Sequence, residues 1–259
     1  MENQITEIPI QTSMIPLPSQ GKLYPIDSPL ASGEIEIKHM TAMEEDILSS
    51  LSLIRRGVVL DKLLEACIVD TKIDINEMLV CDRNAVYIAI RISGFGKDYP
   101  IQITCPNCNL ETKGSTDLGE LNVKFLETSP VSANTNLFKY DTEYEGTPYS
   151  FTFKFITGGD EVKITEIQKK LAVSNPDGNS KEVTLRMIAM IQQLNEHKSS
   201  ETLQFMLPNL PMRLSKKFRN YVDKIEPQVE MKSNVMCSNC GVESEVDVPM
   251  TSDFFWSKS

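Results

Sequence analysis

Two Cys-x-x-Cys turns constrain most strongly what this chain can fold into. Cys105 and Cys108 belong to the first turn, Cys237 and Cys240 to the second, and together they use four of the six cysteines. A gap of two residues lets both thiolates of a turn face one ion, so two turns supply a tetrahedral shell of four sulfurs. Such a shell selects zinc or iron over harder cations. The sequence therefore predicts one structural ion bound by all four cysteines, expected to be zinc, although sulfur ligands alone do not exclude iron.

The segments on either side of the two turns are alike and indicate an internal repeat of strand, turn and strand. Strand-like runs at 101–104 and 229–236 lead into the turns, and polar, strand-compatible runs at 110–113 and 242–246 follow them. The 128 residues between the turns (109–236) exceed the usual spacing of a zinc ribbon, so the site has to be assembled across the fold. Because every ligand position is a cysteine, none is left for water or substrate, which is typical of a structural site.

Two other interpretations of the turns stay open, a redox-active cysteine pair and two unrelated surface turns. A thioredoxin-like pair places its first cysteine at a helix N-terminus after a buried parallel strand. Polar, strand-like segments follow both turns here, which favours the metal site. The other two cysteines, Cys67 and Cys81, lie in apolar, helix-like segments, where cysteine is usually a small core residue.

The charge balance and the lack of long apolar runs narrow the class of protein. A net charge of -10 disfavours generic binding to nucleic-acid phosphates, which requires clustered Lys and Arg. The basic group Lys216, Lys217 and Arg219 is too small for such a footprint. No apolar run reaches the length of a membrane span, and the first residues lack the features of a secretion signal. We therefore expect a cytosolic protein with reduced thiols that contacts neither membrane nor nucleic acid.

The first 33 residues are expected to form an extended arm. Proline and glycine interrupt residues 15–25, so the backbone there should be extended or turning. The same stretch contains Leu17, Leu23 and Tyr24, apolar side chains that a structureless arm does not need. These side chains are expected to dock either on the body of the protein or on a partner chain.

Local patterns predict the elements that follow the arm. Alternation of polar and apolar residues over 34–38 predicts a half-buried strand. Thr41 and Glu44 match a capping box, which starts a helix expected to reach Gly57. The apolar residues expected to share the inward face of this helix are Met43, Ile47, Leu48, Leu51 and Ile54.

Patterns in the second half predict a hairpin, several helices and an aromatic C-terminus. Alternating phenylalanines over 149–156, together with 137–140, predict a β-hairpin, and the turn-forming residues 175–179 break a helical block. Phe254, Phe255 and Trp256 are expected either to be exposed as an interaction handle or to fold back on the metal-binding strands. Apolar residues at helical spacing predict helices within 60–69, 82–92, 162–171, 183–194, 203–207 and 214–225.

These patterns together predict an α+β protein with a mostly helical body. A zinc-ribbon-like β subdomain is formed by the two distant Cys-x-x-Cys knuckles and is accompanied by the β-hairpin. The expected organisation is an extended N-terminal arm at 1–33, a strand and helical region at 34–98, a composite zinc ribbon at 99–117 and 228–250, a β-hairpin and helical region at 118–227, and an aromatic C-terminal tail at 251–259.

Catalytic chemistry has little support in the sequence. Neither of the two histidines, His39 and His197, has a metal ligand or nucleophile nearby at a spacing typical of a metal or catalytic site. The chain contains no Gly-x-Ser-x-Gly elbow, no phosphate-binding loop and no His-Glu-x-x-His motif. We therefore expect a protein that is not an enzyme and has no catalytic residues.

Several short segments follow one another in an order that resembles a known family. LPSQGKLYP at 17–25 precedes IEI at 35–37, EEDIL at 44–48, RISGFG at 91–96 and CPNC at 105–108. Over most of its length the chain resembles the baseplate hub assembly proteins of T4-like bacteriophages. The resemblance brings no active site with it, and it does not by itself imply zinc in every member.

The resemblance implies a role in building the central hub of the tail baseplate, as an assembly factor (a chaperone) or a minor hub component. It implies other hub or tail proteins as partners, in the host cytoplasm during assembly or in the virion baseplate. The arm, the acidic surface and the aromatic C-terminus are the expected contact elements. The oligomeric state is not indicated.

Two other functions are carried as alternatives. One is a nucleic-acid-associated zinc-ribbon accessory protein of a phage, and the other is a thiol oxidoreductase. A basic face around the knuckles would favour the nucleic-acid function. Carboxylates stand there instead, at Glu111, Glu243, Glu245 and Asp247.

Overall fold

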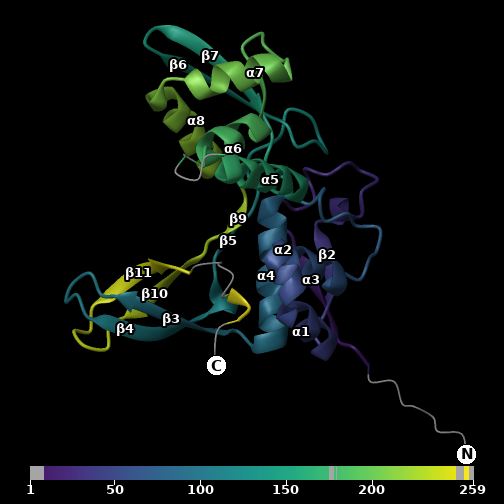
Figure 1. Cartoon of the computed structure of the whole chain (residues 1–259), viewed down its shortest axis with the longest axis vertical. Coiled ribbons are helices and arrows are strands. Elements are labelled where there is room, and N and C mark those ends of the chain that lie inside the picture. Colours follow the sequence, from purple (N-terminus) through teal and green to yellow (C-terminus); the bar gives the residue numbers. More distant parts are fainter. Residues whose placement is uncertain (1–8, 175–177, 179, 249–253, 257–259) are drawn as a thin grey trace, which may run out of the picture.

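The computed structural model describes residues 9–174, 178, 180–248 and 254–256. It combines helices with antiparallel strands, so the predicted α+β class is confirmed at that level. An upper and a lower half are stacked along the longest axis (Figure 1). Helix α4 (Val80–Phe95) runs through the lower half, with the N-terminal elements on one side and two strand hairpins on the other (Figure 1). The upper half contains a three-stranded sheet with helices around it.

The lower half begins with the segment expected to be an arm. Strand β1 (Thr12–Pro16) pairs antiparallel with β2 (Glu34–Lys38), which is the strand predicted from the alternating pattern. Between the two strands, Leu17, Leu23 and Tyr24 are buried. Of the two alternatives for these side chains, docking on the chain's own body is the one found. Residues 1–8 of the expected arm lie outside the described residues.

Hydrogen bonds hold this docked segment against the start of α4. The Tyr24 hydroxyl donates to Asp82 Oδ2 at 2.6 Å and accepts from the backbone N–H of Leu79, the N-cap residue, at 2.9 Å. The Ser19 backbone N–H donates to the other carboxylate oxygen, Asp82 Oδ1, at 2.9 Å. Burial raises the pKa of Asp82, while these donors stabilise its charged form. A distant tyrosine and serine therefore satisfy polar groups at the helix start that water does not reach.

A glycine makes the turn in this segment possible. Gly21 has a φ of +71°, in the left-handed region that side chains with a Cβ rarely adopt. A Cβ at this position would lie 2.5 Å from the carbonyl oxygen of Ala31, in the short helix η1 (Pro29–Ser32). The chain can fold back tightly between β1 and β2 because no side chain occupies that space.

The next element starts as predicted and ends earlier than predicted. Thr41 and Glu44 form both hydrogen bonds of a capping box at the start of α1 (Ala42–Ser49). The prediction of one continuous helix is wrong, because Ser50 is extended (φ -70°, ψ 100°) and separates α1 from α2 (Leu51–Arg56). Gly57, with a left-handed φ of +72°, then ends α2 as expected.

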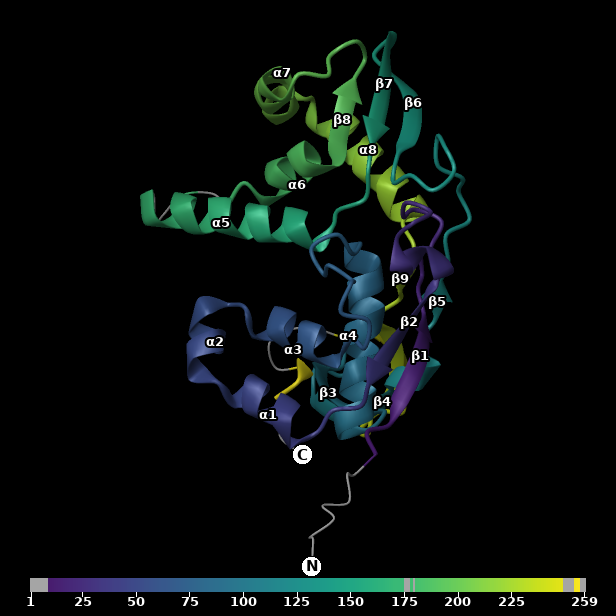
Figure 2. The same cartoon turned by 90° about the vertical axis from the view of Figure 1, so that its right-hand side faces the viewer.

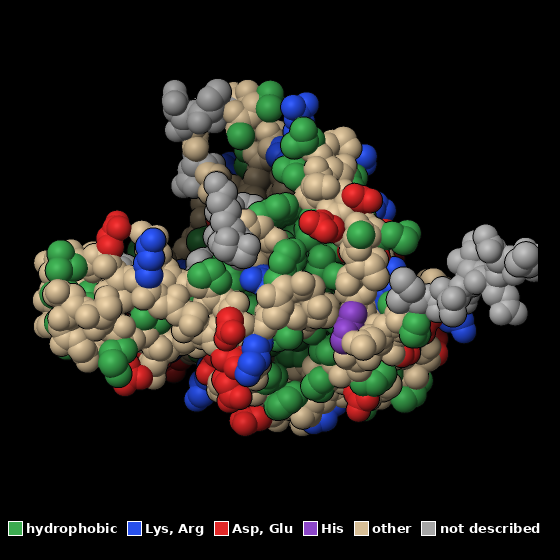
Figure 3. Space-filling model, turned by 90° about the horizontal axis from the view of Figure 1, so that it is seen from below, with side chains coloured by type: hydrophobic (Ala, Val, Ile, Leu, Met, Phe, Trp, Pro, Cys, Tyr) green, Lys and Arg blue, Asp and Glu red, His purple; other side chains and the backbone are tan. Residues whose placement is uncertain are grey.

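The expected inward face of this helical region is only partly buried. Leu48 is buried, but Met43, Leu51 and Ile54 are exposed, and α2 has no buried residue at all. Helix α2 projects from the body of the lower half (Figure 2). Seen from below, the molecule also shows hydrophobic side chains gathered in the middle of the surface among charged ones (Figure 3). The apolar periodicity of the segment therefore does not correspond to a core-facing helix.

The centre of the lower half is formed by α3 and α4. Helix α3 (Val59–Cys67) packs Leu63 and Leu64, both fully buried, into the core. Most residues of α4 are buried, including the charged Asp82 and Arg83. Arg83 forms an ion pair with Asp61 and donates to the Tyr87 hydroxyl at 3.0 Å. The charges inside this core are therefore paired or hydrogen-bonded, as buried charges must be.

The predicted hairpin is present in the upper half and gains a third strand. Strand β7 (Thr147–Phe153) pairs antiparallel with β6 (Phe138–Tyr144) on one side and with β8 (Ile191–Leu194) on the other. The prediction of a helix reaching Leu194 is wrong, since the helix ends at Met190 and the chain turns into β8. Pairing with β7 overrides the helical periodicity of these residues.

Helices cover this sheet and bury an aromatic cluster. Phe151 packs against Phe218 with ring centroids 4.8 Å apart, and Phe138 packs against Phe155 at 4.6 Å. All four rings are almost completely buried. The predicted break at 175–179 lies, except for Gly178, outside the described residues. The helices of this half are α5 (Gly158–Ser174), α6 (Glu182–Met190), α7 (Ser200–Met206), η3 (Leu207–Asn209) and α8 (Met212–Ile225).

The chain passes twice between the two halves, and the two passages pair with each other. Strand β5 (Val123–Lys124), which follows η2 (Leu118–Glu120), pairs antiparallel with β9 (Gln228–Val229). The segment that enters the upper half and the segment that returns from it are therefore held side by side where the two halves join. Within the part of the chain that the structure describes, no helix has the length and apolar character needed to cross a membrane.

The C-terminal aromatic residues fold back on the body. Phe254 and Phe255 are buried, and the Arg91 guanidinium Nε donates to the Phe254 carbonyl at 2.9 Å. The half-buried Trp256 donates its indole N–H to the Leu48 carbonyl at 3.1 Å. Phe254 also packs against Tyr99, near the start of the hairpin that contains Cys105 and Cys108. The expected exposed handle is therefore absent at 254–256, while 251–253 and 257–259 lie outside the described residues.

The hydrogen bonds of Tyr24 lead to a testable prediction. Tyr24→Phe should lower the free energy of unfolding by about 1–3 kcal/mol, because the Asp82 carboxylate and the Leu79 N–H both lose a buried partner. Urea denaturation followed by circular dichroism measures the change. Tyr144→Phe, which removes a hydroxyl that is not enclosed in the core, is the matched control and should change stability by less than about 0.5 kcal/mol. Equal losses of unfolding free energy in both variants would contradict the proposed role of the Tyr24 hydroxyl.

Candidate metal centre

Two antiparallel hairpins position the four cysteines. Strands β3 (Asp98–Thr104) and β4 (Glu111–Asp117) form the first hairpin, and β10 (Lys232–Met236) and β11 (Glu243–Asp247) form the second. Each Cys-x-x-Cys sequence occupies the turn that connects its two strands. The internal repeat of strand, turn and strand predicted from the flanks is therefore what the chain forms.

The two turns have the same backbone hydrogen bonds. In the first, the Cys105 N–H donates to the Leu110 carbonyl and the Asn109 N–H donates to the Cys105 carbonyl, both at 2.9 Å. In the second, Cys237 donates to Val242 and Gly241 donates to Cys237, again at 2.9 Å. The residue after the second cysteine is left-handed in both turns, with φ of +55° at position 109 and +69° at position 241. Asparagine and glycine are the residues that tolerate this conformation best.

The hairpins face each other through β4 and β10. The Thr116 hydroxyl donates to the Ser233 hydroxyl at 2.6 Å across this interface. Val235 packs over Gly114, where an added Cβ would lie only 2.8 Å from Val235 Cγ1. A side chain at position 114 would therefore push the two hairpins apart, and with them the two cysteine pairs.

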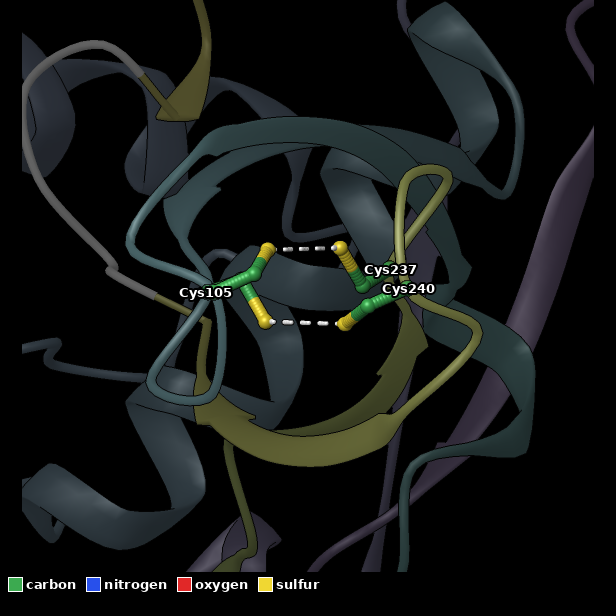
Figure 4. A group of neighbouring side chains, drawn as sticks. Cys105, Cys237 and Cys240 are labelled. Carbon is green, nitrogen blue, oxygen red and sulfur yellow. Dashed lines mark hydrogen bonds between the residues drawn. The ribbon is translucent and has the colours of Figure 1, made fainter.

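All four predicted ligand residues come together between the hairpins. Their sulfur atoms lie within 4.8 Å of one another. Cys105 Sγ is 3.7 Å from Cys240 Sγ, and Cys108 Sγ is 3.7 Å from Cys237 Sγ (Figure 4). A tetrahedron with metal–sulfur bonds of about 2.3 Å has sulfur–sulfur edges of about 3.8 Å. The predicted meeting of the two distant turns is therefore confirmed, and the spacing fits a single tetrahedral ion.

Hydrogen bonds around the sulfurs favour the thiolate forms that bind metal. The Thr112 hydroxyl, 3.1 Å from Cys237 Sγ, and the backbone N–H groups of Cys240 and Asn239 lower the pKa of Cys237 to about 6. The Val242 backbone N–H and then the Asn107 amide, 3.6 Å from the sulfur, lower the pKa of Cys240. Donors that point at a thiolate stabilise its charge, as metal ligation requires.

The four thiols do not all favour the charged thiolate form when no cation is bound. Backbone N–H groups of Cys108 and Asn107 act to lower the pKa of Cys105, yet burial and the neighbouring sulfurs of Cys237 and Cys108 leave it raised. Four thiolates this close repel one another. A bound cation removes that repulsion, so the donor set fits a metal ion better than four free thiols.

The remaining cysteines differ in position and reactivity. Cys67 ends α3 and Cys81 lies near the start of α4, and both are buried in the core. Burial raises the pKa of Cys67 to about 12, and it also raises that of Cys81 well above its usual value. Their predicted role as small core residues agrees with these surroundings.

Two residues that contact the sulfurs were not among the site residues predicted from the sequence. Thr112 is buried and contacts Cys237 from the opposite hairpin, and Asn107 lies within its own turn but contacts Cys240 of the other. The sequence offered one signal for Thr112. It stands four residues after Cys108, on a predicted strand in which side chains alternate between two faces. Which sulfur it contacts depends on how the hairpins face each other, and the sequence does not show that.

Fold and site together define an α+β protein with two strand hairpins that converge on four cysteines. The family model described as T4 bacteriophage base plate protein matches residues 11–256 of the chain. The chain therefore belongs to the T4 bacteriophage base plate protein family. Neither the curated proteins nor the solved structures contain a match to it.

The cysteine cluster predicts a specific outcome for cysteine substitutions. Cys105→Ser and Cys237→Ser should each lose bound metal and unfold the two hairpins, because metal binding at a site of this type contributes to folding. Metal content by mass spectrometry and thermal melting measure the effect. Cys67→Ala is the control and should keep its metal, since Cys67 is not near the cluster. Native metal content and melting in either serine variant would refute a structural site.

The contact of Thr112 with Cys237 predicts a smaller effect on affinity. Thr112→Val preserves the shape of the side chain but removes the donor to the thiolate, so metal affinity should fall by roughly 10-fold. Competition with a chromophoric chelator measures the affinity. Thr112→Ser retains the hydroxyl and should stay closer to the wild type than the valine variant. A valine variant with wild-type affinity would show that the contact does not support the metal site.

Proposed function

We propose that this baseplate-family protein acts in building the central hub of the phage tail baseplate, as an assembly factor or a minor hub component. The observation that carries the proposal is the family match over residues 11–256, which includes nearly all of the chain. Its partners are then other hub or tail proteins, and it works by binding them rather than by turnover. The proposed locations are the host cytoplasm during assembly and, if the protein is retained, the virion baseplate.

We propose zinc as the ion at the four cysteines, with a structural role. Sulfur–sulfur separations of 3.7 Å suit a tetrahedral zinc shell, and an all-cysteine shell leaves no position for a reacting water or substrate. The ion would link the hairpin before the upper half to the hairpin after it. In this role zinc stabilises a scaffold and supplies no chemistry of its own.

The surroundings of the two histidines support a role without catalysis. His39 Nε2 lies 2.7 Å from the hydroxyl of Ser13, which belongs to β1 of a two-stranded sheet. His197 lies in the turn after β8, where its backbone exchanges hydrogen bonds with Leu194. Neither histidine belongs to the four-cysteine cluster. An accessible redox thiol also fits poorly, since all four sulfurs face one another.

Charge on the hairpins favours a protein partner over nucleic acid. Strands β3 and β4 contain Asp98, Glu111 and Asp117 against Lys113. Strands β10 and β11 contain Lys232 against three carboxylates, and Lys232 pairs with one of them, Glu245, at 2.7 Å. A zinc ion with four thiolates adds further negative charge. Phosphate backbones would be repelled from this surface.

Gene deletion and particle analysis test the proposed function. Infection with a phage that lacks the gene should yield no complete baseplates by electron microscopy, and a plasmid copy should restore them. A tagged copy should co-purify with baseplate intermediates, and mass spectrometry of mature particles decides whether it is retained. Complete, infectious particles formed without the gene would refute the proposal. A plasmid copy with Cys67→Ala is the control for nonspecific loss of core packing.

A further inference from the structure

A cleft separate from the metal centre opens between the two halves of the molecule. It has a volume of about 820 Å³. Helices α2 and α3 form one wall, α5 forms the other, and residues of α4 and the C-terminal Trp256 lie between them. Figure 2 shows α2 and α5 projecting from the body on the same side, one below and one above. The cleft therefore has a helix on each side, and the Lys169 amine of α5 reaches across it to 3.5 Å from the position of a Cβ on Gly57, at the end of α2.

Apolar side chains from both walls line the cleft. Ile54 of α2 and Val162 of α5 both line it and are exposed, at 40% and 38%. Leu60, Val80 and Trp256 add apolar surface at its base. The indole of Trp256 is held by its hydrogen bond to the Leu48 carbonyl, so this surface is preformed. Exposed apolar side chains gathered in a groove mark a binding surface more often than isolated ones do.

One side of α5 faces the cleft along most of the helix. Val162, Glu166 and Lys169 line it at positions i, i+4 and i+7, which is the spacing of one helix face. Val173, 84% exposed, continues the same face by one more turn. The part of α5 that lines the cleft, residues 158–169, spans about 17 Å at a rise of 1.5 Å per residue. A wall of this length matches a partner segment of about three helical turns.

Among the residues that the structure describes, the charged ones that line the cleft leave one unpaired cation on each wall. Two lining carboxylates, Asp61 and Glu161, are neutralised by ion pairs with arginines. The other charged lining residues are Arg56 of α2, Lys169 of α5 and the carboxylate of Glu166, and within the described parts of the chain none of these three forms an ion pair. Arg56 and Lys169 are called the basic rim of the cleft.

We propose that the cleft binds an amphipathic helix of another tail protein. The occupant would place apolar side chains at i, i+3 or i+4 and i+7 against Ile54, Val162 and Trp256, and carboxylates against the basic rim. Laying a helix into an apolar groove is a common mode of peptide recognition. This inference rests on the proposed function, because it takes the partner from the proteins that assemble with this chain. A second copy docked by the same face would bring Arg56 and Lys169 against their own counterparts, and nucleic acid would leave the aliphatic lining uncovered.

Site-specific photo-crosslinking during infection tests the occupant. A benzophenone amino acid at position 162 should crosslink to a segment of a different phage protein that has apolar residues at helical spacing and flanking Asp or Glu. The same amino acid at position 205 is the matched control, because Phe205 is exposed (76%) but does not line the cleft. Crosslinks from 162 to a second copy of the chain, to nucleic acid, or to nothing beyond the yield at 205 would each overturn the proposal.

Charge reversal at the rim provides the second measurement. The double variant Arg56→Glu with Lys169→Glu should reduce the crosslink yield from position 162 at least 5-fold. Lys216→Glu with Lys224→Glu, which changes the same charge on α8 away from the cleft, should leave the yield within 2-fold. Equal yields in both double variants would overturn the role of the rim. Thermal melting and metal content of each purified variant show whether it is folded.

The two proposals fail in different ways. If complete particles form without the gene, the assembly role fails, whatever position 162 contacts. If the gene is required but position 162 crosslinks to no acidic amphipathic segment, the assembly role stands and the cleft is not the docking site.

Discussion

The structure depends on holding together two hairpins that lie far apart in the chain. The first hairpin ends at Asp117 and the second begins at Lys232, and most of the intervening chain forms the upper half. Closing a loop of this length has an entropic cost, although that cost grows only slowly with length. The short pairing of β5 with β9, the packing of Val235 over Gly114 and the cluster of four sulfurs all act against that cost. An ion at the sulfurs would make the closure far stronger than packing alone.

The N-terminal segment and the aromatic C-terminus, which the sequence suggested could contact partners, pack against the body of the protein. Tyr24 and Ser19 satisfy the buried carboxylate at the start of α4, and Phe254 packs against the first hairpin. Both ends of the described chain therefore stabilise the lower half through buried side chains, while Trp256 stays half-buried and lines the cleft. Part of the apolar surface that does remain exposed lies on the projecting helices α2 and α5, at Leu51, Ile54, Val162, Ile167 and Val173. A protein that assembles with others by docking would present such surface on the folded body rather than in its tails.

The comparison between pattern and structure separates local from non-local effects. The capping box at Thr41, the hairpin around the alternating phenylalanines and the strand at 34–38 were predictable because each depends on residues close in sequence. The helix break at Ser50 and the strand β8 were not, since apolar spacing in both segments fits a helix. Pairing with β7 decides β8, and nothing in residues 191–194 records that partner.

By itself the sequence determined the four metal-ligand candidates, the repeat around them and the family, because cysteine spacing and short segments in a fixed order are properties of the chain alone. Only the tertiary structure decided that the sulfurs lie 3.7 Å apart in cross-pairs, that Thr112 contacts Cys237, and that a cleft lies between α2 and α5. These features join residues from distant segments, and their geometry is set by how helices and hairpins pack. Packing depends on all the surfaces at once, so no single stretch of sequence contains it.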